Sequence, residues 1–156
     1  RLLSRGLGDV YKRQKLNFAN LLFYKIGFAA SFAAKLADTF GSEIGKRFGG
    51  NTYLITSLRK VDRGTEGGIS LEGTIASAIG SIFMSSIMLV LSILTTNNQF
   101  LMVSISGFLA TISESIIGAK FQEKYKLSNE LVNAIQTSIS SIIAIFIFIS
   151  YLNLTN

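Results

Sequence analysis

Hydrophobic positions gather in four long stretches of the chain, which are separated by shorter polar segments. Three of the stretches, residues 70–96, 100–118 and 131–154, hold only Glu72 and Glu114 as charged residues. A helix needs about 20 mostly apolar residues to cross the hydrocarbon core of a bilayer. We therefore predict three transmembrane helices here. Buried helices or strands of a soluble core are the alternative, but three such runs in a short chain favour a membrane protein.

The remaining stretch, residues 16–37, gives a weaker signal because it carries Lys25 and Lys35. We predict a transmembrane helix here too, so the expected fold class is all-α: a polytopic bundle of about four helices with a glycine-rich cytoplasmic loop. Small residues share one side of the second stretch and would let helix backbones approach closely in lipid; they are Gly73, Ala76, Gly80 and Ser81.

The basic residues between the stretches predict the orientation in the membrane. Segments 41–68 and 119–130 are rich in Lys and Arg, whereas segments 95–99 and 153–156 carry no charge. The positive-inside rule places the two basic segments in the cytoplasm. Polar groups at the ends of the helices then gather on the cytoplasmic side, where ionisable residues are functional candidates; they are Asp38, Glu72, Glu114, Asn133 and Gln136.

The composition removes several kinds of chemistry from consideration. The 156 residues include no Cys and no His. Thiol catalysis, a His-bound zinc site and an imidazole base are therefore excluded. Any reaction must use carboxylates, Lys and Arg, hydroxyls, amides and the backbone of glycine. The length is about that of one domain.

The first residues resemble the translation of a transposon sequencing adapter, because Asp9–Gln14 can be encoded by GAT GTG TAT AAG AGA CAG. We expect residues 1–14 to be such an artefact and residues 15–156 to be the C-terminal part of a single domain; a genuine basic N-terminus is the alternative. Residues 1–14 supply half of the net charge of +6. The charge therefore gives little support to nucleic-acid binding, and we expect no nucleic-acid partner.

Residues 38–74 form the patch richest in glycine, acidic and basic residues. Glycine lets a backbone turn and approach a ligand, and the N–H groups of such turns and of a helix start at Ser70 can bind phosphate. Arginine can grip phosphate oxygens, and carboxylates can hold Mg²⁺. We interpret the patch as a site for a phosphorylated ligand, although each feature alone also fits an ordinary loop. The candidate charged residues are Asp38, Glu43, Arg59, Lys60, Arg63 and Glu66.

Helical spacing places Asp38, Ser42 and Lys46 on one face, which Glu43 borders. If the first helix continued past the membrane, this face would point toward the glycine-rich loop; a solvated helix end is the alternative. Glu114, Gly118 and Gln122 also recur every four residues and would share one helix face. An ordinary contact between helices is the alternative explanation of this second repeat. Neither a Walker A loop nor a GxGxxG motif is present in the sequence.

Three short motifs resemble one integral-membrane family. They are KLADTFGSEIG at residues 35–45, LIT at residues 54–56 and RGTEGGIS at residues 63–70, which Gly73-Thr74 follows. As a set they resemble the family that includes plant and cyanobacterial phytyl-phosphate kinase and animal transmembrane protein 19. The resemblance covers about residues 27–140. Lys35 departs from it, because a small residue is expected there.

The resemblance implies CTP-dependent phosphoryl transfer to an isoprenoid (phytyl) monophosphate, giving the diphosphate in prenyl-alcohol salvage toward tocopherol and phylloquinone. It also implies a multi-pass protein of a bacterial, cyanobacterial-type membrane, and the basic segments place the active site on the cytoplasmic side. A more distant resemblance to membrane cytidylyltransferases, whose motif has a histidine where this chain has Thr65 or Glu66, leaves a CTP:lipid-phosphate cytidylyltransferase as an alternative. A transporter or other non-enzymatic helix bundle is the third alternative.

For the kinase, we expect Mg²⁺ to bridge the phosphates of CTP and to be bound by Asp38 and Glu43. The partners would be the bilayer and an isoprenoid phosphate whose tail lies between the helices. The expected catalytic residues are Asp38, Glu43, Lys46, Arg63 and Glu114. The residues expected to bind the nucleotide are Ser42, Arg59, Gly64, Thr65, Gly67, Gly68 and Ser70.

Overall fold

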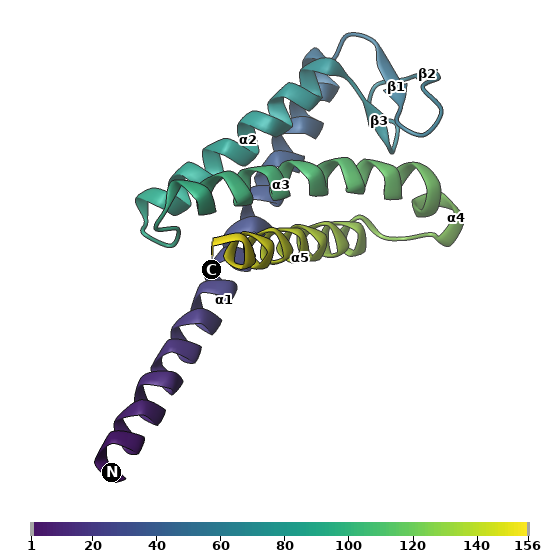
Figure 1. Cartoon of the computed structure of the whole chain (residues 1–156). Coiled ribbons are helices and arrows are strands. Elements are labelled where there is room, and N and C mark those ends of the chain that lie inside the picture. The colour runs from purple at the N-terminus through teal and green to yellow at the C-terminus, as the bar shows by residue number, and fades with distance from the viewer. Residues whose placement is uncertain (1, 156) are drawn as a thin grey trace.

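The computed structural model describes the backbone of residues 2–155 and the side chains of residues 21–155. The side chains of the predicted adapter segment, residues 1–14, lie outside the described residues. Within the described part, most of the chain forms long helices, and a longer segment with short strands joins the first of them to the second (Figure 1). The prediction of an all-α helix bundle is thus confirmed. The long helices are α1 (Leu2–Phe48), α2 (Leu71–Val90), α3 (Asn97–Ile117) and α5 (Asn129–Thr155).

Three helices of the described chain are long and apolar enough to cross a membrane: Leu71–Val90, Asn97–Tyr125 and Asn129–Thr155. They coincide with the three stretches that the hydrophobic pattern assigns to transmembrane helices. The fourth stretch, residues 16–37, is helical as part of α1. That this part of α1 also crosses the membrane stays a prediction.

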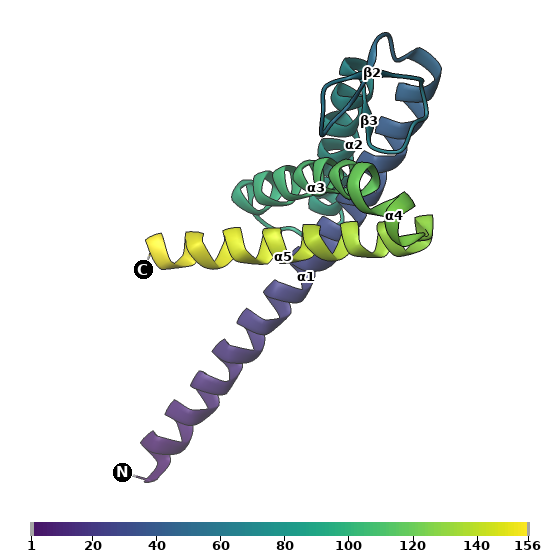
Figure 2. The same cartoon turned by 90° about the vertical axis from the view of Figure 1, so that its right-hand side faces the viewer.

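Small residues allow α1 to pack closely against the other helices. The buried face of α1 is built from alanines, which are Ala29, Ala30, Ala33, Ala34 and Ala37. The small residues predicted on one side of α2 are all buried as well. Serine hydroxyls bind backbone carbonyls of neighbouring helices: Ser81 Oγ donates to Ser104 O at 2.7 Å and Ser140 Oγ to Ala30 O at 2.8 Å. Such contacts are typical of helices packed within lipid. Figure 2 shows the N-terminal half of α1 extending away from this packed region.

Gly80 marks the closest approach of α2 to the backbone of α1, and it provides a first prediction. A Cβ atom there would lie 2.9 Å from Leu36 O and 3.1 Å from Ala37 Cα. Backbone atoms inside a helix cannot yield, so Gly80→Ala should lower the free energy of unfolding by about 2 kcal/mol. Unfolding in detergent by denaturant titration measures this change. Gly27→Ala is the matched control, because its Cβ would meet the flexible end of Ile145 at 3.2 Å. Equal destabilisation by both variants would contradict the close approach.

The segment between α1 and α2 folds into a small antiparallel sheet, which the sequence analysis did not predict. Its strands are β1 (Thr52–Leu54), β2 (Lys60–Val61) and β3 (Gly68–Ile69), in the order β2-β1-β3. Tyr53 pairs with Lys60 on one side and with Ile69 on the other. The backbone N–H of Gly50 donates to Glu72 Oε2 at 3.0 Å. This bond ties the end of α1 to the start of α2, with the sheet between them.

The helix that begins at Asn97 changes its winding near its end. A π-helical turn, η1 (Gly118–Gln122), follows α3 and leads into the short helix α4 (Glu123–Tyr125). The four-residue spacing from Glu114 through Gly118 to Gln122 crosses this change in winding, and a Cβ atom on Gly118 would lie 3.4 Å from Gln122 Oε1. Gln122 Nε2 also donates to Asn129 Oδ1 at 2.6 Å.

Candidate active site

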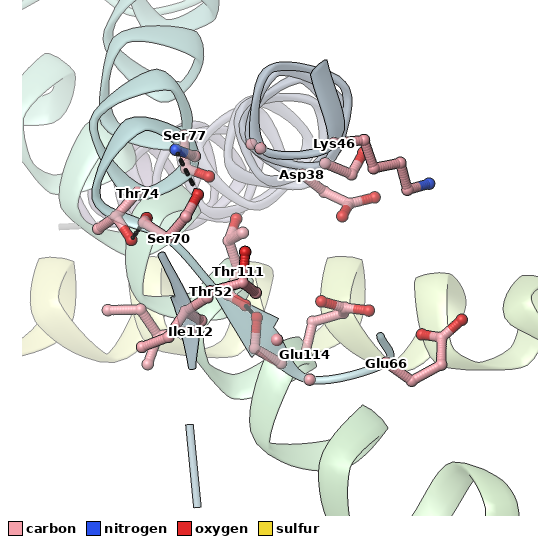
Figure 3. A pocket seen from close by; sticks show the side chains of 18 of the residues that line it. Asp38, Lys46, Thr52, Glu66, Ser70, Thr74, Ser77, Thr111, Ile112 and Glu114 are labelled. Carbon is pink, nitrogen blue, oxygen red and sulfur yellow. Dashed lines mark hydrogen bonds between the residues drawn. The ribbon is translucent and has the colours of Figure 1, made fainter. Parts of the chain in front are cut away.

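A polar cavity lies where the sheet segment meets one end of the helix bundle (Figure 3). Three helices, strands β1 and β3 and the loop before β3 contribute to its walls. The continuation of α1 past residue 37 supplies Asp38, Ser42 and Lys46, as the predicted helical face requires. The first turns of α2 supply small and hydroxyl-bearing residues, which are Ser70, Gly73, Thr74 and Ser77.

Most of the predicted site residues line this cavity although they come from separate parts of the chain. The predicted nucleotide-binding positions in the loop before β3 all take part, and Glu114 reaches the cavity from α3. The predicted residues in the lining are Asp38, Ser42, Lys46, Gly64, Thr65, Gly67, Gly68, Ser70 and Glu114.

Three predicted site residues are exposed and do not line the cavity: Glu43, Arg59 and Arg63. Glu43 is one position beyond Ser42 on α1, a rotation of about 100° that carries its side chain off the cavity face. Arg59 lies in the turn between β1 and β2, beyond the edge of the lining. Arg63 lies near Glu72 at the start of α2, where the opposite charges attract. The metal pair of Asp38 and Glu43 that the sequence predicts thus does not face one cavity.

Gly67 holds the loop before β3 against α3 and η1. Its φ of +72° lies in the left-handed region, as does the φ of +84° at Gly64. A Cβ atom on Gly67 would lie 2.6 Å from Ser115 O and 2.6 Å from Ala119 N. Only glycine combines this backbone conformation with so close a contact. The N–H of Gly68 donates to Thr65 O at 2.8 Å, so it supports the turn.

Acidic side chains dominate the charged groups of the cavity. Figure 3 shows the carboxylates of Asp38, Glu66 and Glu114 on the same side of the site as Lys46. Asp38 and Glu66 lie near enough to Glu114 for their negative charges to act on it. Asp38 also forms an ion pair with Lys35, with 3.0 Å between Nζ and Oδ2. Lys35, which departs from the family motif, thus contacts the acidic residue of that motif.

The carboxylates fit a metal ion that arrives with a phosphate ligand. Among the described residues, no group of three or more Asp or Glu side chains is placed to hold a metal by itself. Mg²⁺ is commonly bound by one or two carboxylates together with substrate phosphates and water. Asp38 and Glu114, which line one cavity, provide such a donor set.

Thr52 is a site residue that the sequence patterns did not predict. Its side chain lines the cavity and is only 5% exposed, yet its Oγ1 has no hydrogen-bond partner within the described structure. A buried hydroxyl without a partner costs free energy, so a ligand atom in the cavity would be its natural partner. The run Thr52-Tyr53-Leu54-Ile55 is typical of a strand and could have indicated β1, although not that Thr52 faces a cavity.

Thr111 on α3 also lines the cavity and links it to the interior of the bundle. Its Oγ1 accepts a hydrogen bond from Gln136 Nε2 at 3.3 Å and donates to Gly107 O at 3.1 Å. Gln136 is fully buried in α5, and its Nε2 also donates to Ala34 O at 3.2 Å. The predicted polar residue of the fourth stretch thus supports the cavity wall through Thr111 and does not line the cavity.

Comparison with known proteins places the chain in a family. The chain belongs to the family described as integral membrane protein DUF92, whose pattern matches residues 6–141. This confirms the family resemblance that the motifs predict and the assignment to integral membrane proteins.

Two relatives show how much of a longer protein the chain covers. "Protein VTE6, chloroplastic" of Arabidopsis thaliana is 45% identical over 125 residues, which are 78% of this chain and 37% of the relative. An uncharacterised membrane protein of Synechocystis sp. is 41% identical over 80% of this chain and 48% of its own length.

A third relative, an uncharacterised membrane protein of Methanocaldococcus jannaschii, is 34% identical over 79% of this chain and 51% of its own length. The chain thus spans about half, or less, of the length of the relatives it matches. No solved structure matches the chain.

Proposed function

We propose that the chain is part of a membrane enzyme that transfers a phosphoryl group from CTP to an isoprenoid monophosphate such as phytyl phosphate. The product would be the diphosphate used in prenyl salvage toward tocopherol. The observation that carries the proposal is the cavity at the end of the membrane helices, where acidic residues, Lys46 and a glycine-rich loop surround the unpartnered hydroxyl of Thr52. Membership of the integral membrane family supports it.

The residues of the cavity suit phosphoryl transfer, which depends on positioning and on neutralising charge. Asp38 and Glu114 would hold the Mg²⁺ of the nucleotide, whose positive charge balances that of the phosphate oxygens. Lys46 would bind a phosphate oxygen, and Thr52 Oγ1 would donate a hydrogen bond to the ligand. The acceptor is already an anionic monophosphate, so a strong base is not required. This agrees with a chain that contains no His.

Three residues expected to take part in the reaction do not line the cavity. Glu43, Arg59 and Arg63 are exposed, so a role in binding CTP would require them to meet the part of the nucleotide that protrudes from the cavity. The segment between α1 and α2 contains Arg59, Lys60 and Arg63, and by the positive-inside rule these basic residues support a site on the cytoplasmic side.

Product analysis tests the proposed reaction. The full-length protein to which this chain belongs is placed in lipid vesicles and supplied with CTP, Mg²⁺ and phytyl phosphate, and both the nucleotide and the lipid products are identified. We expect CDP and phytyl diphosphate. Pyrophosphate together with a CDP-lipid would instead identify a cytidylyltransferase, which uses the same ligands. If CTP is neither consumed nor bound, the cavity serves no nucleotide reaction, and a non-enzymatic helix bundle replaces the proposal.

Thr52→Val separates ligand binding from stability. Valine keeps the size and strand preference of threonine but removes the unpartnered hydroxyl. Without ligand, the free energy of unfolding should therefore stay the same or rise by about 1 kcal/mol. Affinity for Mg-CTP should fall about tenfold, because the ligand loses a hydrogen-bond donor. Calorimetric titration and denaturant unfolding measure the two effects. Thr56→Val, at an exposed turn position outside the cavity, is the control; equal effects on binding would refute the assigned contact.

A further inference from the structure

An apolar groove runs along the outside of the bundle between α2 and α3. Ala78 and Ile82 line it from α2, and Leu101, Ile105 and Phe108 are among the residues that line it from α3. We propose that this groove binds the hydrocarbon chain of a lipid phosphate whose phosphate group occupies the polar cavity. The inference rests on the proposed function, in which such a lipid is the acceptor, and it adds the place and direction of its tail.

Continuity with the polar cavity is the first argument for this occupant. Phe108 lines both the cavity and the groove. On α3, Ile112 and Glu114 border the cavity, and the positions from Phe108 back to Leu101 border the groove. On α2, the cavity residues end at Ser77, and the groove begins at Ala78. Both helices therefore pass from a polar site into an apolar one, as an amphiphilic ligand requires.

The chemistry of the groove is the second argument. Its hydroxyl-bearing residue, Ser104, is buried, and its Oγ donates to Phe100 O at 2.9 Å. The carbonyl of Ser104 accepts the hydrogen bond from Ser81. The polar groups of Ser104 are thus already paired, and the groove offers a ligand apolar contact. An isoprenoid chain can be buried there with no loss of hydrogen bonds.

The position in the membrane is the third argument. Ile82, Leu101 and Ile105 are each about half exposed, at 49%, 53% and 50%. They belong to two helices that can span a bilayer, so within the described structure the groove is open on the outer face of these helices. From Phe108 to Leu101, α3 rises about 10 Å. The groove would thus hold the part of the chain nearest the phosphate, and the remainder would extend into the bilayer.

Photocrosslinking in lipid vesicles tests the inference. The probe is an isoprenoid monophosphate with a diazirine in the first part of its chain, and mass spectrometry locates the labelled residues. We expect labels concentrated at positions 78–82 and 101–108, and we expect unlabelled phytyl phosphate to compete with them. A phosphatidylcholine with the same diazirine serves as the probe for bulk lipid. Labels spread over all lipid-facing helices, or labels that phytyl phosphate does not displace, would overturn the inference.

A substitution that blocks the groove provides a second test. Ala78→Phe places a large side chain in the groove and should lower labelling at positions 101–108 about tenfold, because an overfilled site excludes its ligand. Ala134→Phe makes the same chemical change at an exposed position of α5 and should leave labelling unchanged. Equal labelling of the two variants would refute the groove as the tail site.

The outcomes separate this inference from the proposed reaction. Labelling of the groove without any turnover of CTP would retain the tail site and reject the kinase. Turnover of CTP and phytyl phosphate with labels away from α2 and α3 would retain the kinase and reject the groove.

Discussion

Replacing Asp38 by asparagine should lower CTP-dependent turnover by about 100-fold, the size of effect seen when one charge-stabilising group is lost from an active site. Asparagine keeps the shape of the side chain but cannot supply the negative charge that a Mg²⁺-bound nucleotide requires. Asp38 reaches the cavity from the part of α1 beyond residue 37. Initial rates with CTP and phytyl phosphate measure the effect.

The stability of the protein should barely change in this variant. The ion pair between Asp38 and the half-exposed Lys35 joins side chains three positions apart on one helix. Pairs of this kind contribute at most about 0.5 kcal/mol in solvent. A loss of turnover without loss of stability would therefore locate the effect in the reaction.

Lys35→Gln is the matched control, because it removes the same ion pair and leaves the carboxylate in place. Turnover should remain within about threefold of the wild type. If both variants lose activity equally, the ion pair is what matters, and the metal-binding role of Asp38 is wrong. Glu43→Gln adds a third arm: a large loss there would support the metal pair predicted from the sequence, although Glu43 lies outside the cavity lining.

Gly67→Ala should destabilise the loop before β3 by about 3 kcal/mol. Two causes act together. The backbone at Gly67 has a φ of +72°, which an L-residue with a side chain adopts at a cost. The added Cβ would also lie 2.6 Å from backbone atoms of Ser115 and Ala119, which are fixed within helices. The loop must then leave its position, and the cavity loses one wall.

Hydrogen exchange measures this effect locally. The amide of Gly68 donates to Thr65 O, and the amide of Ile55 donates to Gly67 O at 3.0 Å. Both amides should exchange at least 100-fold faster in Gly67→Ala, as expected when local stability falls by more than about 2.7 kcal/mol. Affinity for Mg-CTP should fall in parallel.

Gly64→Ala separates the two causes. Its φ of +84° is also left-handed, but the nearest atom to an added Cβ is Lys46 Cγ at 3.9 Å. This variant should therefore lose only about 1 kcal/mol. If the two variants behave alike, the contact between Gly67 and the end of α3 does not hold the loop.

The long helices of this fold could be predicted from the sequence because each is marked by an apolar stretch of about 20 residues or more. Apolar stretches of spanning length with at most one charge each predict α2, α3 and α5, and the small residues of the first predict which face of α2 is buried. Helical spacing also placed Asp38, Ser42 and Lys46 on one face, and this face lines the cavity. Periodicity over several turns determines such features locally.

The short elements could not be predicted in the same way. Strands β2 and β3 have two residues each, too few for any alternation of polar and apolar positions. Their pairing is decided by which residues meet in the folded segment, where Tyr53 pairs with Ile69 and Leu54 with Gly68. This arrangement, and not the local sequence, determines that Thr52 lines the cavity and that Arg59 and Arg63 do not. Charge and motif alone treat all of these residues as equivalent.

The π-helical turn after α3 begins where that helix contacts the loop before β3. Gly118 and Ala119, at the start of this turn, lie beside Gly67. If η1 rewound as an ordinary α-helix, the residues after it would rotate about the axis by about 100° for each position of shift. The residues that Gly67 contacts, Ser115 and Ala119, lie before or at the start of the turn, so the change would fall on α4 and on the bond between Gln122 and Asn129. A single extra residue in one helical turn thus sets the direction in which the chain leaves α3 for α5.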